Sequence, residues 1–213
     1  MNHILYYFHD PMCSWCYAFQ PVWAEIKSGL PDEVIVKGVV GGLAPDDDKP
    51  MPQSMQDYIQ QCWQHIQEVV PGIEFNFDYW EKCEPRRSTY PACRAVIAAT
   101  KQASEYEETM IHAIQKAYYQ EARNPSDLQT HIRIATELGL DVPAFEDDII
   151  SEHTNRELNR QVLFTKQSGV SGFPCLTLSI EDAFMHVPHD YNNAQIALDT
   201  IHELLANHAL ETG

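Results

Sequence analysis

Short apolar runs near both ends of the chain predict β-strands. Runs rich in β-branched and aromatic residues, bounded by turn-forming residues, are typical of buried strands. Such runs lie at residues 3–8, 34–40, 172–180 and 183–187. Two strands alone make a marginal sheet. We therefore expect the two ends of the chain to share one sheet.

The segment between the first two runs carries a helical pattern. Apolar residues recur at helical spacing from Cys16 to Ile26, and Gly29 and Pro31 end the pattern. Pro21 lies inside it and lacks a backbone donor, so we expect a kink there. Strand, helix and strand together have the size of a βαβ unit.

The middle of the chain has helical patterns and no convincing strand. A loop with three acids and three prolines opens it at residues 44–53. Apolar stripes with a helical period follow at residues 55–70, 106–118 and 128–138, and residues 153–167 are expected to form one more helix. Ser126 and Gln129 have the spacing of a capping box before the third stripe.

A final helix follows the last two strands, with a stripe from Ile196 to Leu205. The predicted order is βαβ, a helical block, then ββα. We therefore expect an α/β domain formed by residues 1–43 and 156–213, with residues 44–155 as a helical insertion. The chain has 213 residues, 44% of them hydrophobic, which suffices for a sizeable core.

The chain is strongly acidic. Lysine and arginine total 14 and aspartate and glutamate total 31, so the net charge is 14 minus 31, or −17. Such a surface repels phosphate backbones and anionic lipids, which argues against nucleic acid or membrane as a partner. Acidity of this degree also simply keeps a protein soluble.

The start of the chain predicts a cytoplasmic protein, with Met1 taken as the true start. No apolar run approaches the roughly 20 residues of a membrane span. The first apolar stretch, residues 4–8, follows no basic segment and is shorter than a signal-peptide core of about 7–15 residues. In the cytoplasm structural disulfides are rare, and cysteines are mostly thiols, ligands or redox catalysts.

Two cysteines stand close together in the stretch FHDPMCSWCYAF, residues 8–19. Cys13 and Cys16 follow a strand and open a helix within the βαβ unit, which is the arrangement of thioredoxin-like redox sites. The helix N-terminus favours a thiolate at Cys13, and Cys16 lies one turn further, facing the core. Cys13 would attack a partner's disulfide, and Cys16 would resolve the mixed disulfide.

Other uses of this pair have less support. A closed zinc site needs four ligands. The remaining cysteines are scattered, at Cys62, Cys83, Cys93 and Cys175. His186 and His189 could complete a set, but they flank Pro188 in an expected surface loop. We therefore expect no metal. A structural disulfide is disfavoured by the expected compartment.

A second motif supports redox chemistry. The stretch GVSGFPCLTL, residues 169–178, places Phe173 and Pro174 before a predicted strand. In thioredoxin-like folds a cis-proline at this place faces the dithiol. The alternative is an ordinary trans proline that opens an edge strand, since only about one X–Pro bond in twenty is cis.

These motifs, with the helical block between them, resemble the DsbA-like family of thioredoxin-fold oxidoreductases. FrnE-like proteins and 2-hydroxychromene-2-carboxylate isomerases share the insertion, and RRSTYPACRAVIAA at residues 86–99 resembles the segment that opens a long helix of it. The resemblance implies a thioredoxin-like fold with a large all-helical insertion. It implies Cys13 as nucleophile, Cys16 as resolving thiol and Pro174 as cis-proline. The Phe173 backbone would pair with a bound peptide or with glutathione.

The chain departs from these relatives around the dithiol. In the isomerase and kappa-class glutathione transferase branches, as the resemblance implies, a serine that activates glutathione stands in place of Cys13. Ser14 and Trp15 stand where DsbA has a histidine-containing pair, and Asp10 adds negative charge that disfavours a thiolate. We therefore expect a less oxidising couple than that of DsbA. Trp15 is expected at the rim of the site, in contact with the substrate.

The other cysteines are assigned mainly to packing. Cys62 and Cys93 lie on apolar helical faces, where free cysteine packs as a small hydrophobe. Cys175 should point into the core, because neighbouring strand residues face opposite ways. Cys83 follows a loop and should be more exposed. A second redox pair of Cys83 and Cys93 is a weaker hypothesis.

His9 allows two interpretations. It could help to hold the Cys13 thiolate, or it could be a strand-end histidine with a local hydrogen bond, which we favour.

Three hypotheses for the function follow. The first is a thiol–disulfide oxidoreductase of the protein disulfide isomerase kind, acting on a protein or small-molecule thiol or disulfide. It would bind no cofactor, with glutathione as a candidate co-substrate. The second is a glutathione-dependent isomerase or transferase. The third is a binding module or redox sensor that docks a partner.

Overall fold

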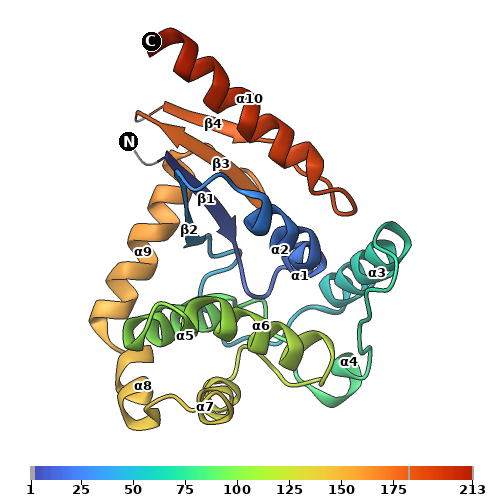
Figure 1. Cartoon of the computed structure of the whole chain (residues 1–213). Helices are drawn as coiled ribbons and strands as arrows, with labels where there is room; N and C mark the ends of the chain where they lie inside the picture. The colour runs from blue at the N-terminus through green and yellow to red at the C-terminus, as the bar shows by residue number, and fades with distance from the viewer. Residues whose placement is uncertain (1–2, 182, 213) are drawn as a thin grey trace.

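The computed structural model describes residues 3–181 and 183–212. These residues form one four-stranded sheet in the spatial order β2-β1-β3-β4 (Figure 1). The strands are β1 (His3–His9), β2 (Val34–Val40), β3 (Cys175–Ile180) and β4 (Ala183–Val187). β2 runs parallel to β1, whereas β3 is antiparallel to β1 and β4 is antiparallel to β3. The two ends of the chain therefore share one mixed sheet, as predicted.

Helices connect and cover the strands. They are α1 (Ser14–Ala18), α2 (Gln20–Gly29), α3 (Gln53–Val69), α4 (Tyr79–Lys82), α5 (Tyr90–Gln102), α6 (Tyr106–Tyr119), α7 (Leu128–Glu137), α8 (Val142–Ile149), α9 (Glu152–Gln167) and α10 (Gln195–Thr212). The hydrophobic pattern of the sequence does not predict α4 and α8, because such short helices contain too few apolar positions to show a helical period. Among the described residues, no helix is long and apolar enough to cross a bilayer.

Helices cover both faces of the sheet. Side chains alternate between the faces along a strand, so Leu5 and Tyr7 of β1 face one way and Tyr6 and Phe8 the other. The first pair packs with α2 and α10 in one buried cluster. On the other face, the ring of Phe164 in α9 lies 5.1 and 5.7 Å from those of Tyr6 and Phe8. Burial of both faces explains why β1 has an unbroken apolar run.

The helical block packs around α5. Small buried residues let neighbouring helices approach this helix closely, and they are Ala92, Ala95, Ala98 and Ala99. α6, α8 and α9 all contact α5, and α9 also contacts β2 (Figure 1). The predicted boundary between residues 155 and 156 lies inside α9. The division of the chain into two domains therefore stays a prediction.

An aromatic cluster joins the block to α1. Trp63 of α3 is fully buried among the rings of Phe75, Trp80 and Tyr119, at centroid distances of 5.0, 5.0 and 5.5 Å. Tyr119 of α6 stacks in turn on Tyr17 of α1 at 4.6 Å. The buried aromatic surface anchors α1, whose first turn carries the predicted dithiol.

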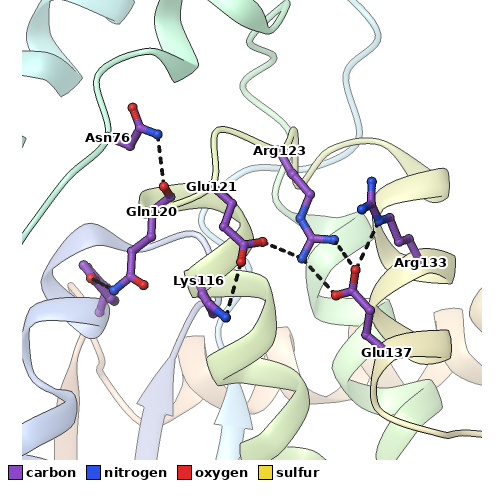
Figure 2. A network of polar contacts seen from close by, with 8 residues as sticks. Asn76, Lys116, Gln120, Glu121, Arg123, Arg133 and Glu137 are labelled. Carbon is purple, nitrogen blue, oxygen red and sulfur yellow. Dashed lines mark hydrogen bonds and ion pairs between the residues drawn. The ribbon is translucent and has the colours of Figure 1, made fainter.

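Charged side chains tie the end of α6 to α7. Figure 2 shows Arg123 between Glu121 and Glu137. Its guanidinium donates two hydrogen bonds, of 3.0 and 3.1 Å, to Glu137 and lies 2.9 Å from Glu121. Arg133 donates a further bond of 3.1 Å to Glu137. Arg123 lowers the pKa of Glu137 from its usual value, and the bidentate pair fixes the α6–α7 connection.

One local expectation is confirmed and one is wrong. The helix that opens at Cys13 is interrupted near Pro21, as expected: α1 ends at Ala18, and Pro21 lies in the first turn of α2, where its missing donor is not needed. Ser126 does not cap α7, because its hydroxyl donates to the carbonyl of Ser88 at 2.9 Å. Asp127 occupies the cap position without a side-chain hydrogen bond.

The fully buried His131 of α7 predicts a loss of stability in acid. Burial lowers the pKa of His131 to about 4 from its ordinary 6.5, so between these pH values the unfolded chain binds a proton that the folded chain excludes. The free energy of unfolding must therefore fall as the pH falls through this window. Relative to a His131→Gln variant, the wild type should lose about 2 kcal/mol between about pH 7.5 and about pH 5.

Urea unfolding at the two pH values measures this difference. His202→Gln, at an exposed position of α10, is the matched control and should follow the wild type. A stability difference between wild type and His131→Gln that does not change with pH would contradict the prediction.

Candidate active site

The first turn of α1 holds the two predicted redox cysteines. Cys13 is the N-cap of α1, and its Sγ accepts a hydrogen bond of 3.4 Å from the backbone N–H of Cys16. Cys13 is 7% exposed and Cys16 is 0% exposed. Both are free thiols. Cys13 is therefore the more accessible residue of the two, which allows the cysteines to act in sequence.

The segment before β3 meets Cys13. The peptide bond between Phe173 and Pro174 is cis, and the Cys13 thiol donates to the Phe173 carbonyl at 3.5 Å. These residues meet because Phe8 of β1 pairs with Cys175 of the antiparallel β3, so the segments that flank this pair share one edge of the sheet. The roles given to Phe173 and Pro174 in substrate binding stay predictions.

A glycine makes room for Phe173. A Cβ atom at Gly41 would lie 1.9 Å from Cζ of the Phe173 ring, so only glycine allows the ring to lie on the backbone just after β2. No local pattern in the sequence marks Gly41, because the close approach joins segments more than a hundred residues apart.

A groove of about 560 Å³ lies beside Pro174. Segment 168–173 forms one wall, and Phe184 and His186 of β4 form another. Tyr191 lines the groove too, and its ring lies 4.6 Å from that of Trp15. Trp15 thus contacts a residue of the groove wall, and its expected contact with the substrate stays a prediction. The volume is within the range of small-ligand sites.

Asp10 is a buried hydrogen-bond acceptor beneath the dithiol. Its Oδ1 accepts from the backbone N–H of Met12 at 2.8 Å. Its Oδ2 accepts from the N–H of Leu43 and the hydroxyl of Thr89, both at 2.7 Å, and more weakly from the thiol of Cys93 at 3.6 Å. Burial raises the pKa of Asp10. The sequence predicts only a charge effect for Asp10, whereas in the structure its carboxyl group bridges three segments.

The inner side of Cys16 faces aromatic rings. Burial raises the pKa of Cys16 well above the usual thiol value, and burial together with the neighbouring Cys16 raises the pKa of Tyr7. The Tyr7 ring stacks on Trp23 at 4.4 Å and on His9 at 5.0 Å.

His9 differs from the sequence-based expectation. Neither ring nitrogen has a hydrogen-bond partner among the described residues, and burial lowers the pKa of His9 to about 4. The favoured local hydrogen bond is therefore wrong.

Cys175 also differs from the expectation. It points away from the dithiol, as strand alternation requires, but it is only partly buried, and its Sγ lies 3.8 Å from Nδ1 of His186. The reason is that α9 ends at Gln167, so this end of the sheet face is left open. Burial raises the pKa of Cys175.

The structure does not bring Cys83 and Cys93 together. The Cys83 thiol donates to the Ala122 carbonyl at 3.1 Å and packs beside the aromatic cluster. Cys93 is fully buried in the core of the helical block. Cys62 is partly buried rather than a core residue. Within the described ranges, no group of three or more His, Cys, Asp or Glu side chains could hold a metal ion.

Comparisons with known proteins agree with this geometry. A family model described as thioredoxin matches residues 6–193. The structure of a candidate protein disulfide isomerase from Nitrosomonas europaea is 25% identical, with a TM-score of 0.86 over 98% of this chain and 100% of that chain. Cytosolic disulfide reductase DsbM from Pseudomonas aeruginosa, also solved with GSH, is 22% identical, with a TM-score of 0.77 over 95% and 99%. The thioredoxin-like fold and the DsbA-like resemblance are confirmed.

A curated relative is longer than this chain. The ClpXP adapter protein SpxH of Bacillus subtilis is 23% identical over 192 residues, which are 88% of this chain and 63% of that protein. The chain thus spans less than two-thirds of the length of this relative.

The hydrogen bonds around Asp10 predict that replacement of Thr89 lowers the free energy of unfolding. In Thr89→Val the hydroxyl that donates to Asp10 is lost, and the N–H of Ala44, which donates to the same hydroxyl at 3.1 Å, loses its acceptor. Both groups are buried, so the free energy of unfolding should fall by about 1–3 kcal/mol. Urea unfolding measures the change. Thr136→Val, which removes an exposed hydroxyl bonded within α7, is the control, and an equal cost in both variants would refute the prediction.

Proposed function

The chain belongs to the thioredoxin family, and from this premise we propose that it is a cytoplasmic thiol–disulfide oxidoreductase of the protein disulfide isomerase kind. One observation carries the proposal. The Sγ of Cys13 lies at the start of α1 with the N–H of Cys16 on one side and the carbonyl that precedes Pro174 on the other. The dithiol is the Cys-Ser-Trp-Cys sequence of residues 13–16.

The first step is attack by Cys13. Its thiolate displaces one sulfur of a substrate disulfide, forming a mixed disulfide and releasing a thiolate that takes a proton. The backbone N–H of Cys16, 3.4 Å from the Sγ, and the helix N-terminus favour the negative charge on Cys13.

The second step is resolution by Cys16. This thiol loses its proton, attacks the Sγ of Cys13 and displaces the second substrate thiolate. The substrate disulfide has then gained two electrons and become two thiols, and the protein holds the disulfide. Because burial raises the pKa of Cys16, it stays protonated while Cys13 reacts first.

The groove beside Pro174 would hold the substrate. A peptide or glutathione would pair with the Phe173 backbone, and Trp15 and Tyr191 would contact its far side. The proposal assigns no bound cofactor, and glutathione serves as co-substrate. The relative DsbM, named as a cytosolic disulfide reductase and solved with GSH, supports both the location and the small-thiol substrate.

Partner binding is a second candidate function. The curated relative SpxH is named as an adapter protein, and this chain matches less than two-thirds of its length. Under this alternative the dithiol would act as a sensor, and the oxidised form would bind a protein partner without turnover.

The reduction potential of the Cys13–Cys16 pair is the first test. The serine and tryptophan between the cysteines stabilise a thiolate less than a histidine does, so the potential should lie below that of DsbA, about −120 mV, and nearer to thioredoxin, about −270 mV. Equilibration in glutathione buffers with tryptophan fluorescence as readout measures it. A value as high as that of DsbA would refute the expected couple, and failure to form the disulfide would refute the oxidoreductase itself.

Trapping separates the roles of the two cysteines. In the presence of oxidised glutathione, Cys16→Ser should accumulate a mixed disulfide between Cys13 and glutathione, because no thiol remains to resolve it. Cys13→Ser should form no mixed disulfide at the active site. Intact-mass spectrometry detects the added glutathionyl group, and Cys62→Ser is the control that should behave as wild type. If Cys16→Ser keeps full glutathione-dependent turnover of an isomerase or transferase substrate, the isomerase hypothesis replaces the proposal.

A further inference from the structure

A second cavity lies on the α2 side of the sheet, apart from the groove beside Pro174. It has a volume of about 510 Å³, and residues of β1, β2, α2 and α6 line it. It shares no lining residue with the groove beside Pro174. We refer to it as the α2–α6 cleft.

An unsatisfied histidine lines the α2–α6 cleft. His9 is 1% exposed, and neither of its ring nitrogens has a partner among the described residues. Buried polar groups in native proteins are almost always hydrogen-bonded, and leaving one unpaired costs about 1–3 kcal/mol. A neutral imidazole offers one donor and one acceptor. His9 is among the residues that line the cleft, so a polar partner would meet the ring from that side.

The charge of the cleft favours a cation. Glu105, Glu107 and Glu108 line it, against the single ammonium of Lys27. Lys27 already forms an ion pair with Glu108. His112 also lines the cleft, lies 3.6 Å from Glu108, and has a pKa lowered by burial. Two carboxyl groups, those of Glu105 and Glu107, thus remain without a counter-charge in the described part of the chain.

Glu107 is built into the cleft wall. A Cβ atom at Gly38 would lie 2.1 Å from Oε1 of Glu107, so a glycine in the middle of β2 makes room for the carboxyl group. The two oxygens have no hydrogen-bond donor among the described residues. Burial, with a contribution from Glu108, raises the pKa of Glu107, which is the response of a carboxyl group without a cationic partner.

Aromatic rings complete the lining. Tyr7 and Trp23 line the cleft and stack on each other at 4.4 Å. Lys27 Nζ lies 5.8 Å from the centre of the Trp23 ring, which shows that this ring can form a cation–π contact with an ammonium group.

Strand geometry sets how far apart Gly38 and His9 lie. Gly38, beneath Glu107, pairs with Tyr7 in the sheet, and His9 follows Tyr7 by two residues on the same face. Two strand residues span about 6–7 Å and neighbouring strands lie about 4.8 Å apart, which places Gly38 and His9 about 8 Å apart. We propose that the α2–α6 cleft binds a small aliphatic ammonium ion that carries a second polar group, with the ammonium group on Glu107 and the second group on His9. This site does not depend on the redox role of Cys13.

Titration calorimetry with 4-amino-1-butanol tests the site at roughly physiological ionic strength, where loose attraction to the acidic surface is screened. The wild type should bind one equivalent. Glu107→Gln keeps the size of the side chain and removes its charge, so it should weaken binding about tenfold, the loss of a charge-assisted contact. Glu146→Gln removes an exposed acid from α8, outside the cleft, and should bind as wild type.

Control ligands show whether the positive charge of the amine is required for binding. 1-Butanol lacks the charge and butyrate carries the opposite one, so neither should bind. In nitrogen NMR, the signals of one neutral imidazole ring should shift as 4-amino-1-butanol is added. The absence of these signals in His9→Gln assigns them to His9. Equal binding of 1-butanol, equal binding by Glu107→Gln, or no saturable binding of the amine would overturn the proposal.

Discussion

The buried carboxyl group of Asp10 holds the parts of the site together. It accepts hydrogen bonds from the loop that precedes Cys13, from the N–H of Leu43 after β2 and from Thr89 before α5. These three segments belong to the sheet and to the helical block, which have separate cores. A fully buried carboxyl group is tolerated only with such partners. The position of the dithiol therefore depends on a contact between the two parts of the chain.

The mixed sheet is the second constraint. Because β3 is antiparallel to β1, the end of β1 and the start of β3 lie at one edge, next to the start of α1. Cys13 then meets the carbonyl of Phe173 although 160 residues separate them. The ring of Phe173 in turn needs the bare backbone of Gly41 after β2. β1, β2 and β3 thus each contribute one terminus to the site.

Two cavities of different chemistry lie near the dithiol. The groove beside Pro174 is lined by Phe173, whose carbonyl accepts a hydrogen bond from the Cys13 thiol, and by Tyr191, whose ring lies against that of Trp15. The α2–α6 cleft is lined by Tyr7, on the face of the sheet that α2 covers. Phe173 and Pro174 line the first cavity, and glutamates, aromatic rings and an unpaired imidazole line the second. One fold therefore offers a site for a thiol or disulfide and, on our proposal, a separate site for an ammonium ion.

The sequence by itself determined the strands, most of the long helices and the position of the dithiol, because these depend on local periodicity and on residues three apart, such as Cys13 and Cys16. Tertiary structure alone decided the surroundings of His9, the exposure of Cys175 and the partners of Asp10. These depend on which distant segment covers a side chain. A strand pattern shows that Cys175 turns away from the dithiol, but only the end of α9 at Gln167 decides that it meets a groove instead of a core.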